Sequence, residues 1–118
     1  MFSIIEADSI QHMKTMQKES IDLIVTSPPY AANKVPLLKN NGSLLLNVGY
    51  TKVGKNETLP LSYLYHEIAY RLGLKMVQEV VWRYYGGMAY KLRYTHRTER
   101  ILWFSKDPDA CTFNLDSV

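Results

Sequence analysis

The chain has 118 residues, of which 47% are hydrophobic and 21% are charged, and it carries 14 Lys and Arg residues against 11 Asp and Glu. This length allows one domain with a real core, and the ordinary apolar content with few Gly and Pro residues excludes collagen-like, disordered and disulfide-scaffold proteins. The single Cys111 forms no internal disulfide, no apolar run approaches the roughly 20 residues of a membrane span, and residues 1–6 lack a signal-peptide pattern, so we expect a cytoplasmic protein without a metal site.

The N-terminal segment predicts a strand followed by a helix. Residues 2–7 predict a short strand. Asp8 or Ser9 is then expected to be the N-cap of a helix, because Gln11 follows Asp8 by three residues, as in a capping box. This helix is expected to end at residues 19–20.

The rest of the chain predicts alternating strands and helices. Residues 21–26 are rich in β-branched side chains and stop at a proline turn, as a buried strand of a parallel sheet does. Residues 42–49 predict a second buried strand bounded by glycines. Residues 58–73 predict a helix with a proline in its first turn, and residues 74–84 and 100–104 predict two more strands. This order predicts an α/β fold with a mostly parallel sheet and an antiparallel hairpin at its edge.

The segment between the last two predicted strands is basic and aromatic. From residue 83 to residue 100 it has five basic residues and one acid, Glu99, which gives a charge of +4. The basic residues are Arg83, Lys91, Arg93, Arg97 and Arg100, and the tyrosines among them are Tyr84, Tyr85, Tyr90 and Tyr94. Basic residues interleaved with aromatic ones suit a phosphate backbone with exposed bases. The alternative is a solvated loop whose tyrosines pack on the core.

The sharpest local feature is the run from Thr26 to Tyr30, at the end of a predicted strand where ligands bind in open α/β sheets. Pro28 and Pro29 fix the backbone and remove two donors, which leaves carbonyl groups that only accept hydrogen bonds. With the Ser27 hydroxyl and the aromatic face of Tyr30, this turn suits a flat ring that bears an amino group. The alternative is an ordinary proline turn after a strand.

Four segments resemble motifs of the amino-group DNA methyltransferases, which modify cytosine N4 or adenine N6. Residues 22–30, Asp-Leu-Ile-Val-Thr-Ser-Pro-Pro-Tyr, look like the catalytic motif. Residues 4–9 resemble the strand and acid that precede it, residues 41–49 the next motif, and residues 95–106 a later motif on the hairpin. Because the catalytic motif comes first, the order resembles that of the permuted β group, TSPPY type.

This resemblance implies a Rossmann-like sheet that binds S-adenosylmethionine and transfers its methyl group to an exocyclic amino group. The substrate implied is double-stranded DNA with a flipped target base, in the restriction-modification system of a bacterium, archaeon or phage, with the protein near the nucleoid. Serine before Pro-Pro-Tyr resembles the cytosine-N4 enzymes, so cytosine N4 is favoured and adenine N6 is the alternative. Further alternatives are a catalytically silent DNA-binding or partner subunit and a methyltransferase for RNA or protein amides.

The resemblance also implies roles for individual residues. The implied catalytic residues are Ser27, Pro28, Pro29 and Tyr30. The implied cofactor-binding residues are Asp8, Thr26, Ser27, Asn47 and Gly49. The implied DNA-binding residues are Arg83, Lys91, Arg93, His96 and Arg97. The alternative for His96 and Glu99 is that they anchor the hairpin, and Cys111, which has no Pro-Cys context, is expected to be structural.

Two departures from the family pattern concern the extent of the domain. The aromatic-x-Gly-x-Gly cofactor motif is absent from the sequence, and we expect it beyond residue 118 with a target-recognition region. Only eleven residues, Pro36 among them, separate Tyr30 from Gly42, although parallel neighbouring strands need a crossover of about a dozen or more. We therefore expect residues 1–118 to form a partial catalytic domain, with residues lost after Tyr30 and after Val118. A genuine short crossover would disfavour parallel pairing of the two strands.

Overall fold

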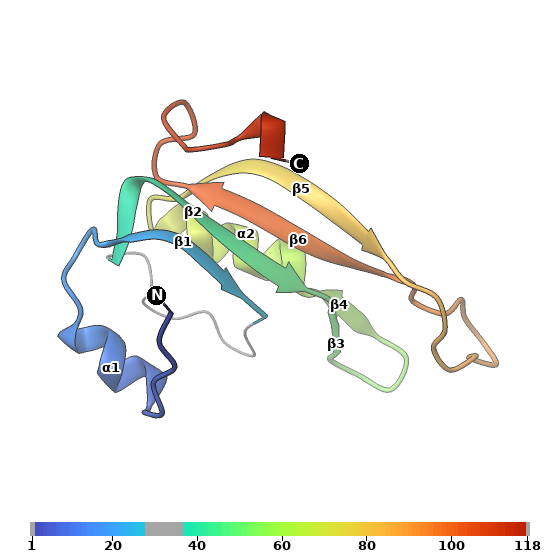
Figure 1. Cartoon of the computed structure of the whole chain (residues 1–118). Helices are drawn as coiled ribbons and strands as arrows, with labels where there is room; N and C mark the ends of the chain where they lie inside the picture. The colour runs from blue at the N-terminus through green and yellow to red at the C-terminus, as the bar shows by residue number, and fades with distance from the viewer. Residues whose placement is uncertain (1, 28–36, 118) are drawn as a thin grey trace.

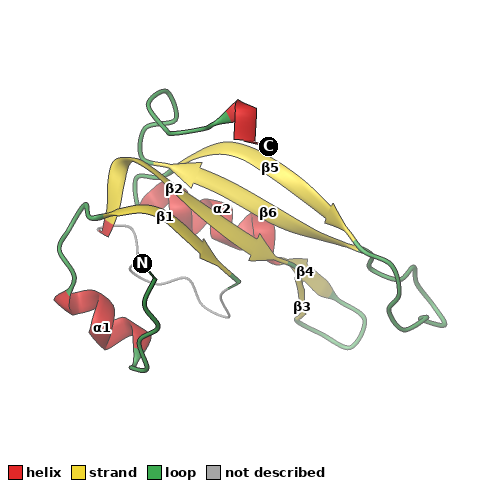
Figure 2. Ribbon diagram, viewed as in Figure 1, coloured by secondary structure: helices red, strands yellow, loops and turns green. Residues whose placement is uncertain are grey.

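The computed structural model describes residues 2–27 and 37–117, and these residues form two α-helices and six strands (Figures 1 and 2). In chain order the elements are α1 (Ser9–Thr15), β1 (Ile21–Thr26), β2 (Leu38–Val48), β3 (Tyr50–Lys52), β4 (Thr58–Pro60), α2 (Leu61–Arg71), β5 (Lys75–Arg83), β6 (Thr98–Ser105) and a 3-10 turn at Leu115–Ser117. The predicted α/β class is therefore confirmed.

Four of the strands form one sheet in the order β1-β2-β6-β5, and β3 pairs with β4 in a separate hairpin. β1 runs parallel to β2, whereas β6 is antiparallel to both β2 and β5. The antiparallel hairpin predicted at the edge is thus confirmed as β5 and β6. In this four-stranded sheet one of the three pairings is parallel and two are antiparallel, so the described sheet is mixed and not mostly parallel as predicted. β1 and β2 are parallel neighbours, and the connection between them, residues 28–36, lies outside the described residues.

Gly42 lies inside β2 and does not begin the strand as predicted, since β2 starts at Leu38. A Cβ atom at Gly42 would come within 2.8 Å of the Leu38 Cδ1 atom and 2.9 Å of the Asp22 carbonyl oxygen. Glycine is therefore required where the two backbones approach closely. The register of β1 against β2 also shifts here, between Ile21 and Leu23.

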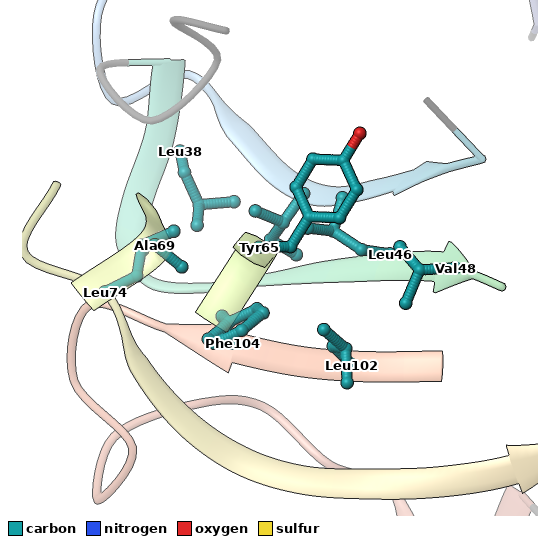
Figure 3. Packing of buried hydrophobic residues seen from close by; sticks show 9 residues of the cluster. Leu38, Leu46, Val48, Tyr65, Ala69, Leu74, Leu102 and Phe104 are labelled. Atoms are coloured by element: carbon teal, nitrogen blue, oxygen red, sulfur yellow. The ribbon is translucent and has the colours of Figure 1, made fainter. Parts of the chain in front are cut away.

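α2 covers one face of the sheet and closes the core (Figure 3). Its buried residues are Tyr65 and Ala69, one helical turn apart. They pack with alternate residues of β2 and β6, which share one face of the sheet. The cluster also includes Leu38, Leu44, Leu46, Val48, Leu74, Leu102 and Phe104. Gly73 follows the helix at φ 81°, as predicted, and Pro60 stands at the N-cap rather than in the first turn.

The opposite face of the sheet is open in the described structure. Leu23 and Val25 on β1 are 53% and 67% exposed, and Trp82 on β5 is 51% exposed. The prediction that residues 21–26 form a buried strand is therefore wrong for the described residues, although the strand itself is present. The physical reason is that α2 covers one face only.

The N-terminal segment differs most from its prediction. Residues 2–7 are exposed and form no strand, because no strand of the described residues lies beside them to pair with their backbone groups. Asp8 caps α1 as predicted, with its Oδ1 atom accepting from the Gln11 backbone N–H at 2.8 Å. The helix ends at Thr15, earlier than predicted. Neither helix in the described ranges is long and apolar enough to cross a bilayer.

Candidate functional site at the carboxyl edge of the sheet

β1 and β2 end side by side at one edge of the sheet, which we name the carboxyl edge. In their parallel register Thr26 lies beside Leu46, so Ser27 and Asn47 come next at the same level. Ser27 is exposed and Asn47 is half-buried. Ligands of open α/β sheets bind at this kind of edge. The other predicted catalytic residues lie outside the described part of the chain: Pro28, Pro29 and Tyr30.

Asn47 is held by a carboxylate from the neighbouring strand. Its Nδ2 atom donates to Glu99 Oε2 on β6 at 2.8 Å. Because a carboxylate only accepts, this bond fixes which end of the amide faces Glu99. The Asn47 Oδ1 atom is buried and has no hydrogen-bond partner among the described residues. A buried acceptor without a partner costs about 1–3 kcal/mol, so this oxygen is suited to an N–H donor of a ligand.

His96 is half-buried and packs against Tyr50, the first residue of β3. Its ring stacks on Tyr50 with centroids 4.3 Å apart and planes 25° from parallel. Its backbone carbonyl accepts from the Tyr84 hydroxyl at 3.3 Å, and the Tyr84 N–H donates to the Arg97 carbonyl at 3.0 Å. Together with the Asn47 bond to Glu99, these contacts support the alternative in which His96 and Glu99 anchor the hairpin. Tyr50 had no role in the prediction, although it directly follows a predicted site residue, Gly49.

The remaining predicted cofactor residues differ in position. Thr26 is half-buried beside Leu46, on the edge itself. The Gly49 carbonyl accepts from the Leu61 N–H at 2.9 Å, which ties the end of β2 to the start of α2. Asp8 is the exposed N-cap of α1, and no hydrogen bond or ion pair joins it to the carboxyl edge within the described residues. The described residues hold no group of three or more His, Cys, Asp or Glu side chains placed for a metal ion.

The predicted basic segment forms a tip, residues 84–97, that projects beyond the carboxyl edge (Figure 1). The pairing of β5 with β6 ends at Arg83 and Thr98. Val48, the last residue of β2, lies opposite Arg100, so the hairpin extends past the point where β2 ends. The structure therefore brings the tip and the Ser27 region to the same edge of the sheet.

Cations and tyrosines are paired in and beside the tip. The Arg93 guanidinium lies 4.4 Å from the centre of the Tyr90 ring, and that of Arg83 lies 5.9 Å from the centre of the Tyr85 ring. Tyr85 and Tyr94 are 88% and 97% exposed. The alternative in which these tyrosines pack on the core is therefore wrong. The other cations predicted to contact DNA, Lys91 and Arg97, are exposed as well.

The sequence profile of a DNA methylase family matches residues 31–118. The type II methyltransferase M.ScaI of Streptomyces caespitosus is 32% identical over 134 aligned positions, which cover 94% of this chain and 43% of that protein. The chain thus spans less than half the length of this relative. Since 94% of this chain is about 111 residues, about 23 aligned positions of M.ScaI have no counterpart here. This number exceeds the dozen or so residues that a crossover between parallel strands needs.

Two solved structures share the fold. TTHA0409 of Thermus thermophilus, solved with S-adenosyl-L-methionine, superposes with a TM-score of 0.71 at 20% identity, over 92% of this chain and 55% of that one. The PvuII DNA methyltransferase, described as cytosine-N4-specific, gives a TM-score of 0.67 at 20% identity, over 86% of this chain and 48% of that one. These likenesses confirm the methyltransferase-like α/β fold. Because the family profile covers most of the sequence, the chain belongs to the family of amino-group (N6 and N4) DNA methylases.

Proposed function

We propose that this chain is part of the catalytic domain of a DNA methyltransferase that transfers a methyl group from S-adenosylmethionine to an exocyclic amino group, in a restriction-modification system. The observation that carries the proposal is the carboxyl edge. There Ser27, the first residue of the Ser-Pro-Pro-Tyr turn, stands beside Asn47 and its unpartnered buried oxygen. That arrangement occurs in a chain of the DNA methylase family.

The role proposed for the turn is to activate the exocyclic amino group of the base, which is a weak nucleophile. The lone pair of an aromatic amine is delocalised into the ring, and positive charge develops on the nitrogen as the new bond to carbon forms. The Ser27 oxygen and the Pro28 carbonyl accept hydrogen bonds from the two amino protons, which localises the lone pair and stabilises the developing charge. Tyr30 stacks on the ring and offsets part of the few kcal/mol needed to take a base out of the duplex.

The described residues of the carboxyl edge fit part of an S-adenosylmethionine site. When bound, this cofactor supplies the methyl group and carries an amino group on its adenine ring and an ammonium group on its methionine part. Asn47 Oδ1, which has no partner among the described residues, would accept a hydrogen bond from either group. We assign the Ser27 hydroxyl, the half-buried Thr26 and the backbone of Gly49 to the same site. Asp8 is also assigned to it, from the family resemblance.

Cytosine N4 is the favoured target and adenine N6 is the alternative. The argument is the serine at position 27, where family members that modify adenine usually carry aspartate. The PvuII enzyme, which shares the fold, is described as cytosine-N4-specific. The proposed substrate is double-stranded DNA with the target base flipped out, and the proposed protein is encoded by a bacterium, an archaeon or a phage and acts near the nucleoid. The proposed DNA contacts are made by Lys91, Arg93 and Arg97 of the tip and by Arg83 directly before it.

We propose that methyl transfer needs more of the domain than residues 1–118. The sequence contains no aromatic-x-Gly-x-Gly cofactor motif, and M.ScaI is more than twice as long as the part matched here. The competing function is a catalytically silent subunit that binds DNA without cofactor. The exposed cations of the tip favour that alternative as much as they favour an enzyme.

Binding of S-adenosylhomocysteine to the full-length protein separates the two functions. We expect it to raise the melting temperature, by an amount that corresponds to about 2.7 kcal/mol at 100 times its Kd. Asn47→Leu is expected to remove most of this stabilisation. The free variant is expected to lose some stability, because Glu99 Oε2 loses its hydrogen-bond donor, so each shift is measured against the melting temperature of the same variant without ligand. The control is Asn56→Leu, at an exposed position. Salt-sensitive DNA binding without any cofactor-induced shift would favour the silent subunit.

A further inference from the structure

The outer part of the tip exposes apolar side chains. Leu92 and Tyr94 are 93% and 97% exposed, and Met88 and Tyr85 are 82% and 88% exposed. Single exposed apolar residues are common on protein surfaces, whereas a contiguous group marks a site of interaction. Four such side chains fall within ten residues of one loop, and this density along the chain points to a partner that removes them from water.

The tip has a defined shape before any partner binds. The Thr95 hydroxyl donates to the Met88 carbonyl at 3.2 Å, and the Tyr84 bonds to residues 96 and 97 close its neck. Gly86 and Gly87 have φ values of 99° and 97°, a backbone region that favours glycine. A Cβ atom on Gly87 would lie 3.2 Å from Thr95 Cγ2. A loop fixed in this way loses less conformational entropy on binding than a flexible one.

The charge of the tip selects a polyanion. Residues 84–97 contain three Lys and Arg residues and no acid, and Arg83 directly precedes them. Lys91 and Arg93 flank Leu92, and Arg93 also precedes Tyr94, so cations and exposed apolar groups alternate along the chain. A duplex offers both matching surfaces, since phosphates run along its outside and base faces become available when a step is unstacked.

We propose that Leu92 and Tyr94 insert into the base stack of duplex DNA while Lys91 and Arg93 contact the phosphates beside them. This inference rests on the proposed function for the identity of the partner. The tip lies beyond the edge that carries Ser27, so it reaches the duplex on the side where the target base leaves the stack. The inserted side chains fill the space left by that base and slow its return.

The test compares two duplexes of about 24 base pairs, one intact and one with an abasic site at a single position. The abasic site is chosen because it removes the free-energy cost of unstacking a base. The full-length protein is expected to bind the abasic duplex about tenfold more tightly than the intact one. In the Leu92→Ala, Tyr94→Ala double variant this preference should fall below about twofold. The control is Tyr70→Ala, a tyrosine on α2 that is 71% exposed. Circular dichroism checks that every variant is folded.

Each outcome bears on the inference separately from the methyl-transfer proposal. Equal preference for the abasic duplex in the double variant and in the unchanged chain would overturn insertion. Insertion would also be overturned if the chain binds neither duplex but binds vesicles of anionic phospholipid through Leu92 and Tyr94, which would make the tip a membrane contact. A preference lost in the double variant supports insertion even in a protein that binds no S-adenosylhomocysteine, and the failure would then belong to the proposed function.

Discussion

The sheet face beneath α2 and the carboxyl edge are built from the same strands, yet they differ in how their side chains are buried and paired. Under α2, Leu102 and Phe104 are at most 1% exposed and pack into one cluster. At the carboxyl edge Asn47 keeps a buried oxygen without a partner in the described residues, and the tip beyond it exposes Tyr94 almost completely.

This difference separates stability from function. Burial of apolar surface under α2 supplies the free energy that keeps the strands together. The carboxyl edge contributes one unsatisfied acceptor among the described residues, Asn47 Oδ1, and the tip contributes exposed rings. Neither stabilises the free protein, and both become favourable only when a ligand is bound. Substitutions in the two regions should therefore change different measurements.

The largest expected effect on stability is in the covered face. Phe104→Ala should lower the free energy of unfolding by about 3–5 kcal/mol, because it removes a fully buried ring and leaves a cavity. Val25→Ala, on the open face at 67% exposure, should change it by no more than about 0.5 kcal/mol. Urea unfolding measures both. Equal losses would mean that the open face is covered in solution and that the comparison is wrong.

A smaller effect is expected at the tip. Lys91→Ala should reduce DNA affinity by about 1 kcal/mol or less and lower the slope of log K against log salt by about 1, since one phosphate contact is lost. The free energy of unfolding of this variant should equal that of the unchanged chain, because Lys91 is exposed. Lys55→Ala, exposed in the loop between β3 and β4, is the control. A salt slope altered equally by both variants would show that DNA binding depends on surface charge in general and not on the position of Lys91.

Local sequence patterns predicted those elements whose causes are local. The β-branched run of residues 21–26, the cap at Asp8 and the glycine that ends α2 were all placed correctly. Burial was predicted less well, because it depends on what lies across a face. The exposure of Val25 follows from the single helix that covers the sheet, and residues 2–7 lack a neighbouring strand among the described residues.

The site was predicted as a set of residues but not as a set of contacts. Ser27, Asn47 and Gly49 are brought to one edge, as the motif order implied. The bond between Asn47 and Glu99 joins residues 52 positions apart, and the stack of Tyr50 on His96 joins residues on different hairpins. Such pairs depend on strand register, which the sequence pattern of one chain leaves open.

The most direct test of the central claim is methyl transfer by the full-length protein, with Ser27→Ala compared with Ser62→Ala as a control in α2. We predict that nucleoside mass spectrometry of the treated DNA shows N4-methylcytosine. Ser27→Ala should lower the rate of its formation by about 100-fold or more, as expected for loss of a hydrogen bond that strengthens in the transition state. The melting temperature should stay unchanged, because Ser27 is exposed. An unchanged rate in Ser27→Ala would contradict the claim that the carboxyl edge is where the methyl group meets the base.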